Sequence, residues 1–418
     1  MKKTLIRNAR LLGYEDLKNV LIEGEKFASI VNANNPEELQ LYHNEIDING
    51  KLIVPGFVDI HMHLDKAYTW PAIQNRSGTL TEAIINYEIA LEQMNVSDLV
   101  RRMTTTVENS IRHGTTSIRT HLNYSNPNYM RKAVEAFNRV KDVYKNLIDL
   151  EAVLMLPFEI DFREEKEIRW AVENGIALLG GAPHLAQCPQ KNLYKIFELA
   201  TEMDVKIDLH IDESDDPSVK MLKDVCEWVI KEKYSHRIIA GHCTSISAMD
   251  ENEAGELIYM VREANIGIVT LPSSNFYLQG RQDKGIIRRG LTRVKDFLKA
   301  GVPVAAASDN IQDPFHPYGK ADMLQTALLT SYGAHMNSNK EVLKLIEMVT
   351  AIPAEFMELE KYGLDEGKKA DFVIINCNDI ESALSSQTAE RETWKNGQSV
   401  CRVQEKIEWL HPENNRIY

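Results

Sequence analysis

The sequence predicts an α/β protein in which a (β/α)₈ barrel is joined to a small β-domain made from both ends of the chain. Eight short apolar runs are separated by longer segments with helical patterning. Strands that alternate with helices favour parallel βαβ units, and eight such units favour a closed barrel. The two ends of the chain instead carry short alternating strands.

The two terminal segments share a pattern of short strands in which apolar and polar residues alternate. Residues 1–54 contain TLIRNARLL, NVLIEGEKFASIV and EIDINGKLIV, and the tail contains KKADFVIINC and ETWKNGQSVCRVQ. This likeness favours pairing of the two ends into one domain over two separate appendages. We therefore expect three segments, with residues 1–54 and 359–418 forming the β-domain and residues 55–358 forming the barrel.

The apolar runs give the barrel strands in order, and the intervals between them read as helices. The runs are residues 56–63, 116–122, 149–156, 176–182, 206–211, 237–243, 267–272 and 302–309. One interval illustrates the helices, because an apolar residue recurs at every fourth position and forms one stripe. The stripe consists of Leu99, Met103, Val107 and Ile111. Ser97 is the expected N-cap, and Gly114 is suited to the left-handed position after the last turn.

Composition excludes several classes of protein. The formal net charge is -13, which does not suggest a nucleic-acid partner. The five cysteines form no C-x-x-C pair, as expected in a reducing compartment. The beginning, MKKTLIRNARLL, lacks a signal-peptide core, and no apolar stretch is long enough for a bilayer. We expect a cytoplasmic protein with no nucleic-acid or membrane partner, and the sequence leaves a homo-oligomer open.

Six of the twelve histidines follow or end the apolar runs, where barrel enzymes carry their active sites. His61 and His63 are two residues apart on a strand, so both side chains face the same way. The residues at the run ends are His61, His63, His121, His184, His210, His242 and Asp309. Such a concentration predicts a site at the carboxyl ends of the strands.

Four of these residues predict a metal centre. Three imidazoles, from His61, His63 and His210, together with the carboxylate of Asp309, suit Zn²⁺ or Fe²⁺ and leave room for a water molecule. Glu213 follows His210 by three residues and is the expected proton shuttle. A solvated loop carboxylate explains Glu213 about equally well, because the segment DESDDPS holds several acids.

Several motifs resemble the amidohydrolase superfamily, and more narrowly its cytosine-deaminase-like branch, which also contains N-isopropylammelide amidohydrolase. The motifs are PGFVDIHMHLDKAYT, HIDE, the GH at 241–242 and the ASDN at 307–310. The resemblance implies a distorted (β/α)₈ TIM barrel with a small β-sandwich formed by both termini.

The resemblance also implies one divalent metal ion per chain, zinc or iron, held by His61, His63, His210 and Asp309. It assigns proton shuttling to Glu213, and it assigns to His242 the orientation or polarisation of the attacking water. Binuclear relatives bridge two ions through a lysine at the end of the fourth strand. Here that strand ends GGAPH, without a lysine, which favours a single ion.

The expected activity is hydrolytic deamination of a small aminated N-heterocycle with a pyrimidine, purine or triazine-like ring. Metal-bound hydroxide would attack the amino-bearing ring carbon, Asp309 and His242 would help to take the water proton, and ammonia would leave. The alternative is an N-alkylamine or cyclic amide hydrolase with the same metal site. A non-catalytic barrel is disfavoured because all four ligand positions and Glu213 are present.

Substrate recognition is the least specific part of the resemblance. Phe158 stands where cytosine deaminases carry a glutamine, and Asn310 stands where they carry a second aspartate. The residues expected to contact the substrate are Phe158, Glu159, His184, Asn310, His121 and His316. For Phe158, Glu159, His184 and His121 a structural role is also open, since isolated aromatic and histidine side chains often only pack.

Overall fold

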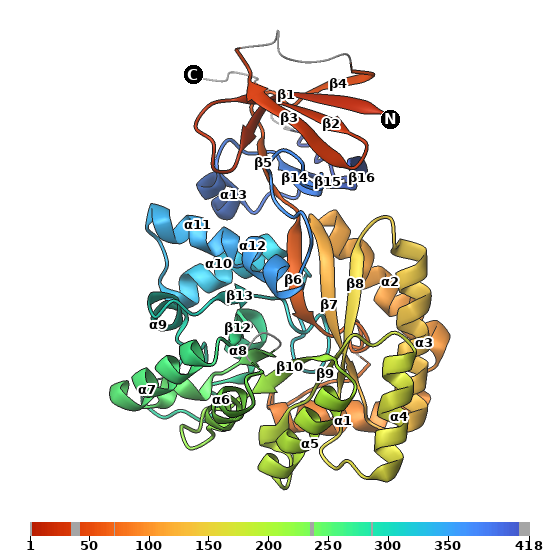
Figure 1. Cartoon of the computed structure of the whole chain (residues 1–418), viewed down its shortest axis with the longest axis vertical. Helices are drawn as coiled ribbons and strands as arrows, with labels where there is room; N and C mark the ends of the chain where they lie inside the picture. The colour runs from red at the N-terminus through yellow and green to blue at the C-terminus, as the bar shows by residue number, and fades with distance from the viewer. Residues whose placement is uncertain (1, 35–41, 71, 235–237, 286, 409–418) are drawn as a thin grey trace.

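The computed structural model describes residues 2–34, 42–70, 72–234, 238–285 and 287–408, and it contains a barrel and a separate sheet (Figure 1). The barrel sheet runs in chain order from β6 to β13, and an isolated parallel bridge between Met62 and Asp309 joins its two edges. Its strands are β6 (Phe57–Met62), β7 (Thr115–Asn123), β8 (Asp149–Met155), β9 (Leu178–Gly180), β10 (Lys206–Ile211), β11 (Ile238–His242), β12 (Gly267–Thr270) and β13 (Val304–Ala306). The expected eight-stranded barrel is confirmed, although Arg237, the first residue of the sixth expected strand, lies outside the described residues.

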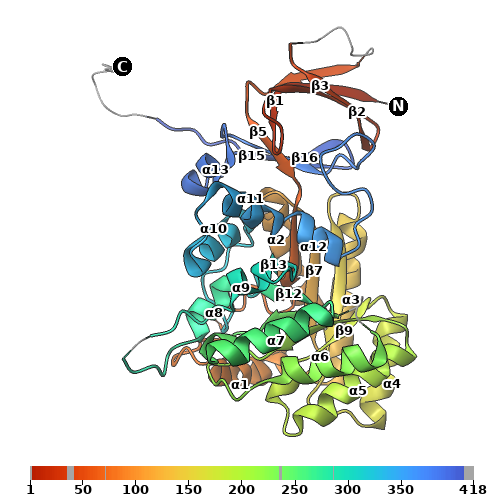
Figure 2. The ribbon, with the colours of Figure 1, turned by 60° about the vertical axis from the view of Figure 1, so that its left-hand side comes forward.

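Helices surround the barrel sheet, as Figures 1 and 2 show from two directions. The helices are α1 (Leu80–Ala90), α2 (Val96–Arg112), α3 (Pro127–Tyr144), α4 (Phe162–Glu173), α5 (Pro189–Glu202), α6 (Met221–Glu232), α7 (Glu251–Glu263), α8 (Pro272–Leu278), α9 (Val294–Lys299), α10 (Met323–Ala334), α11 (Asn339–Glu347), α12 (Ala351–Phe356) and α13 (Ile380–Ser386). Short 3₁₀ turns lie at Leu91–Gln93, Pro183–Leu185 and Ser245–Ala248.

Helix α2 shows how its sequence sets its ends. The predicted apolar stripe is buried, and Gly114 follows the helix with a φ of 98°. The predicted cap is wrong, because the helix begins earlier than expected. Asn95 is the N-cap and accepts a hydrogen bond from the backbone N–H of Asp98 at 3.0 Å, so Ser97 lies inside the first turn.

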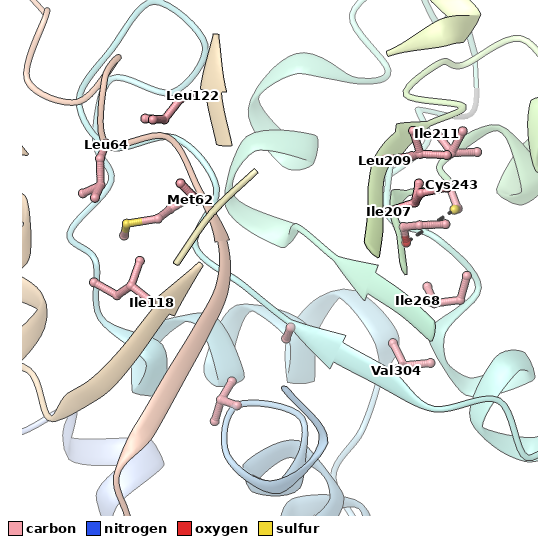
Figure 3. Close-up of a cluster of buried hydrophobic side chains, with 14 of the residues drawn as sticks. Met62, Leu64, Ile118, Leu122, Ile207, Leu209, Ile211, Cys243, Ile268 and Val304 are labelled. Carbon is pink, nitrogen blue, oxygen red and sulfur yellow. Dashed lines mark hydrogen bonds between the residues drawn. The ribbon is translucent and has the colours of Figure 1, made fainter. Parts of the chain in front are cut away.

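The main core consists of buried side chains from the barrel strands and from the helices that cover them. Figure 3 shows part of it, with Met62, Leu64, Ile118, Leu122, Ile207, Leu209, Ile211, Cys243, Ile268 and Val304 labelled. All of these side chains are buried. Parallel strands are covered on both faces, which is why they appear in the sequence as nearly continuous apolar runs.

The second sheet joins the two ends of the chain, as expected. Its order is β16-β15-β14-β5-β1-β2-β3, with β4 beside β1. Its strands are β1 (Lys3–Leu11), β2 (Lys18–Glu23), β3 (Lys26–Asn32), β4 (Asn44–Asp47), β5 (Leu52–Pro55), β14 (Phe372–Ile375), β15 (Arg391–Lys395) and β16 (Gln398–Arg402). A second core fills this unit, and the rings of Phe27 and Phe372 lie 5.5 Å apart in it.

The terminal sheet meets the barrel at the amino ends of the barrel strands. Strand β5 leads directly into β6, and the backbone N–H of Gly56 bonds to the carbonyl of Asp371 at 3.0 Å. The carboxyl ends of the barrel strands therefore open at the opposite end of the molecule. We retain the division into residues 1–54, 55–358 and 359–418 as a proposal, and residues 409–418 of the last segment lie outside the described part.

Two further features bear on the surroundings of the protein. Over the described ranges, no helix combines the length and the apolar character needed to cross a bilayer. All five cysteines are free thiols: Cys188, Cys226, Cys243, Cys377 and Cys401.

Candidate active site and metal centre

Three imidazoles and one carboxylate converge at the carboxyl ends of the barrel strands. His61 Nε2 lies 3.1 Å from His210 Nε2, which in turn lies 3.2 Å from His63 Nε2. The Oδ1 atom of Asp309 lies 3.3 Å from His63 Nε2 and 3.8 Å from His61 Nε2. His61 is on β6, His63 directly follows it, His210 is on β10, and Asp309 follows β13.

The local backbone is built to bring these side chains together. Asp309 has a φ of 61° and His242 a φ of 67°, and such left-handed values are uncommon for residues other than glycine. On β11, Gly241 leaves space for His61, since a Cβ at this position would lie 3.0 Å from the His61 ring. The sharp turns after β11 and β13 therefore aim His242 and Asp309 at one point.

The four donor atoms fit a divalent cation. Ligand atoms about 2.1 Å from a common tetrahedral centre lie about 3.4 Å apart, which matches the separations of 3.1–3.8 Å in the cluster. Both oxygens of Asp309 are buried without a hydrogen-bond donor among the described residues. His61, His210, His242 and Asp309 form a group of possible ligands within 4.8 Å of one another, and this group does not include His63.

The protonation of the histidines also suits a metal ion. Burial lowers the pKa of His61 to about 3, and it lowers the pKa of His63 and His210 well below the ordinary value. The imidazoles are therefore neutral near pH 7, with a nitrogen lone pair free, and this is the form that binds metals.

Glu213 lies beside this cluster and is buried rather than solvated. Burial, reinforced by the nearby charge of Asp309, raises its pKa well above the ordinary value. One of its oxygens, Oε1, lies 3.5 Å from His242 Nδ1. Burial of this kind favours the protonated form of the carboxyl group, which can donate a proton to a ligand.

His242 is held by a residue that sequence reasoning missed. The side-chain amide of Asn275, on α8, donates to His242 Nδ1 at 3.0 Å. This bond favours the tautomer with the proton on Nε2. Burial lowers the pKa of His242 to about 3, so the ring is neutral. The sequence offered no signal for Asn275, because its role depends on how α8 folds back across the barrel.

A cavity of about 300 Å³ opens over the cluster. His63, His210, Glu213, His242 and Asp309 line its polar part. Much of the remaining wall is apolar and includes Leu80, Ile84, Met155, Phe158, Leu185 and Phe315. Concave, mostly apolar cavities with a few convergent polar groups are typical of small-molecule sites.

The predicted substrate residues fall in different places. Phe158 and Asn310 line the cavity, and the amide of Asn310 donates to Asp313 at 2.7 Å. His316 is half-buried behind them, with its Nδ1 3.0 Å from the carbonyl oxygen of Asn310. Glu159 lines a separate surface depression next to the cavity.

His121 is buried and His184 is half-buried, and neither lines the cavity. The ring of His121 lies 4.0 Å from that of His61, and its Nε2 lies 3.6 Å from Asp208. His61, His121 and Asp208 form a second group of possible ligand atoms. Asp208 already pairs with Arg119 at 2.9 Å, which offsets its charge.

The cavity also contains polar residues that the sequence did not single out as site residues. The ammonium group of Lys66 lies 4.8 Å from the ring centre of Phe315. Glu88, Asn123 and Ser125 line another part of the wall. Glu88 is on α1, Asn123 ends β7 and Ser125 follows it, and only the folded chain places the three side chains in one wall.

Comparisons with known proteins agree with this geometry. The model of the amidohydrolase family matches residues 167–401. Pterin deaminase of Rhizobium rhizogenes (strain K84) is 31% identical over 361 residues, which cover 85% of this chain and 82% of that protein. The N-isopropylammelide isopropyl amidohydrolase of Pseudomonas sp. (strain ADP) is 27% identical over 412 residues, which cover 95% of this chain and 97% of that protein.

A solved structure shows the same likeness over the whole fold. The crystal structure of 5-methylcytosine deaminase from Klebsiella pneumoniae, liganded with 5-fluorocytosine, matches with a TM-score of 0.89 and 27% sequence identity. The match covers 97% of this chain and 99% of that chain. The likeness therefore includes the barrel and the terminal sheet.

Proposed function

The chain belongs to the amidohydrolase family, and from this premise we propose that it is a hydrolytic deaminase of a small aminated N-heterocycle. One observation carries the proposal: Glu213, a buried carboxyl group with a raised pKa, stands beside three neutral imidazoles and the carboxylate of Asp309 at the floor of a cavity. The relatives act on C–N bonds of pterin, 5-methylcytosine and N-isopropylammelide, as their names state.

We propose that His61, His63, His210 and Asp309 hold one divalent ion, zinc or iron. When bound, such an ion lowers the pKa of a water molecule and so supplies a nucleophile near neutral pH. The side chains supply the rest of the chemistry. Asp309 offers an oxygen without a hydrogen-bond donor, which can accept the proton of the attacking water.

Glu213 and His242 act on the substrate side of the reaction. The protonated carboxyl of Glu213 donates its proton to the ring nitrogen next to the amino-bearing carbon, which makes that carbon more electrophilic. His242, with its proton on Nε2, orients the attacking water. A proton passed through Glu213 or Asp309 then reaches the amino group, and ammonia leaves.

The cavity wall supports a flat ring as the substrate. Phe158 is 42% exposed at the cavity, so its ring face is open for stacking. Asn310 presents a polar edge that its bond to Asp313 holds in place. We propose these two residues as substrate contacts, and we assign Glu159, His121, His184 and His316 to supporting positions around them.

A second activity has specific support. The relative from Pseudomonas removes an alkylamine, by its name, and it matches almost the whole chain. Hydrolysis of an N-alkylamine or a cyclic amide would use the same residues. The five free thiols further support a reducing compartment, and we propose a cytoplasmic location on that basis.

Product analysis tests the proposal. Metal-loaded protein is incubated with pterin, cytosine, 5-methylcytosine, isocytosine, isoguanine, creatinine and amino- and alkylamino-triazines. Ammonia release from at least one ring is the expected result. Alkylamine release, or ring opening without ammonia, would replace the deaminase assignment with the second activity. A metal-loaded protein that turns over none of these rings would remove the support for deamination of this class.

A further inference from the structure

We propose that Glu88, Asn123 and Ser125 form a polar subsite at the mouth of the cavity, which binds hydrogen-bond donors on the outer part of the substrate. The substrate is accordingly a fused bicyclic aminated heterocycle rather than a single ring. This inference rests on the proposed function, because it places the reacting carbon over the cluster of His210 and Asp309. All five residues line the same cavity.

The subsite lies outward from the metal cluster. Asn123 follows His121 by two residues on β7, and a strand advances roughly 3.3 Å per residue. Asn123 is therefore roughly 6.6 Å further along the strand toward solvent than the histidine that contacts His61. Exposure agrees with this order, since His61 is buried, Asn123 and Ser125 are half-buried and Glu88 is exposed.

The three side chains are already arranged to receive a donor. The Oε1 atom of Glu88 accepts hydrogen bonds from Ser125 Oγ at 2.6 Å and from Asn123 Nδ2 at 3.2 Å. Asn123 Nδ2 also lies 2.6 Å from Ser125 Oγ. Over the described part of the chain, no hydrogen bond involves Glu88 Oε2, so this oxygen is available to a ligand.

The size of the cavity supports an extended ligand. Its volume of about 300 Å³ is at the lower end of the range for cavities that hold drug-sized ligands. The apolar side chains of Leu80 and Ile84, which precede Glu88 on the same helix, line the same cavity. A fused ring system would stack along such a wall, react at the floor and present its outer N–H or amino groups to Glu88.

The experiment compares Glu88→Gln with the wild type and with Glu92→Gln. The control removes an exposed carboxylate close to the end of α1 that does not line the cavity. The probes are pterin, which has two fused rings, and cytosine, which has one. Binding is measured by titration calorimetry on the metal-loaded protein, and ammonia release gives KM and kcat.

Glu88→Gln is expected to raise Kd and KM for pterin about tenfold, in line with a hydrogen bond to a partly exposed charged group. The kcat for pterin and all constants for cytosine should stay unchanged, as should all constants of Glu92→Gln. Equal losses for both rings, together with a lower Tm, would show that Glu88 only ties α1 to the segment after β7, and would overturn the inference.

The remaining outcomes separate this inference from the proposed function. If pterin binds without ammonia release and Glu88→Gln still weakens binding, the subsite stands and the deaminase proposal fails. If cytosine is deaminated while pterin neither binds nor reacts, the deaminase proposal stands and the extended substrate is overturned. If neither ring binds or reacts, the extended substrate is overturned, and the remaining rings of the panel decide the deaminase proposal.

Discussion

The two carboxyl groups of the site, Glu213 and Asp309, differ in what surrounds them. Burial, reinforced by the charge of Asp309, raises the pKa of Glu213 well above its ordinary value, whereas Asp309 lies close to the Nε2 atoms of His61 and His63. Pairs of carboxyl groups in contrasting environments commonly divide acid and base work between them.

Replacing Glu213 with glutamine tests the proton donor. Glu213→Gln keeps the shape and removes the transferable proton, so kcat should fall by about 10²–10⁴-fold. Bound metal, measured by elemental analysis, should stay at the wild-type level because Glu213 is not among the four converging ligands. Glu256→Gln changes an exposed carboxylate on α7 and serves as the control. Normal turnover by Glu213→Gln would refute the assigned role.

Replacing Asn275 tests whether His242 needs its amide partner. Asn275→Ala removes the donor to His242 Nδ1 and leaves that nitrogen buried without a partner. We expect kcat to fall about 10–100-fold, as is common for residues that orient an active-site histidine, with unchanged metal content. The dependence of kcat on pH should also change shape. Loss of metal together with activity would point to a structural role instead.

At the scale of elements, close packing between neighbouring strands positions the residues proposed as metal ligands. Strands β10 and β11 pair in register, with His210 opposite Gly241 and Ile211 opposite His242. Gly241 therefore lies opposite His210 and directly before His242. Because it has no side chain, the ring of His61 can pack against its backbone. The packing of the barrel strands therefore sets the positions of the site histidines, in addition to forming a hydrophobic core.

Two glycine substitutions separate this effect from general stability. Gly241→Ala places a Cβ 3.0 Å from the His61 ring and 3.3 Å from the carbonyl of Leu209, so metal affinity should fall by about 10–100-fold. Gly255→Ala, in α7, meets nothing within 4 Å. It should raise the free energy of unfolding by about 1 kcal/mol, because alanine favours the helix. Metal titration and urea unfolding measure the two effects.

For the whole molecule, a buried ion pair joins the terminal sheet to the barrel. Arg391, on β15, contacts both oxygens of Asp322 at 2.8 and 3.1 Å and donates to the carbonyl of His113 at 2.8 Å. Asp322 also caps α10 by accepting the N–H of Leu324 at 3.0 Å. The terminal sheet is thus tied to a helix that follows the last barrel strand.

Removing Arg391 should destabilise the protein strongly. Arg391→Met leaves Asp322 buried and unpaired, so we expect a loss of about 3–5 kcal/mol in the free energy of unfolding at pH 7. The double variant with Asp322→Asn keeps an N-cap without a charge and should lose less. Urea unfolding of the three proteins provides the measurement. A double variant as unstable as the single one would contradict an effect of the unpaired charge.

The same pair predicts a pH dependence. Burial alone would raise the pKa of Asp322, but the Arg391 guanidinium outweighs it and the pKa lies below the ordinary value of 3.8. The stabilisation is therefore fully present above about pH 4, and it is lost as pH falls through the lowered pKa. The stability gap between wild type and Arg391→Met should narrow as the pH falls towards 3.8, because the unpaired Asp322 of the variant becomes protonated, and it should narrow further below 3.8. A gap that stays constant to the lowest pH at which the protein folds would contradict this.

The sequence predicted the barrel because buried parallel strands appear as apolar runs. It predicted the terminal sheet because short strands with alternating apolar and polar residues occur at both ends of the chain. His61, His63, His210 and Asp309 were predictable as a group, since each follows or ends such a run. Asn275, Lys66 and Glu88 were not, because their positions depend on how α8, the segment after β6 and α1 fold over the barrel mouth. The cap of α2 was misplaced because Asn95 and Ser97 are both good N-caps and only packing chooses between them.

The central claim is that one divalent ion at this cluster drives release of ammonia from a heterocycle. The most direct test removes the metal and then follows ammonia release, with the best substrate of the panel, as zinc or iron is added back. The account predicts that activity rises in proportion to bound metal and reaches a plateau at about one equivalent per chain. Full activity without metal, a plateau only at about two equivalents, or no ammonia at full occupancy would contradict it.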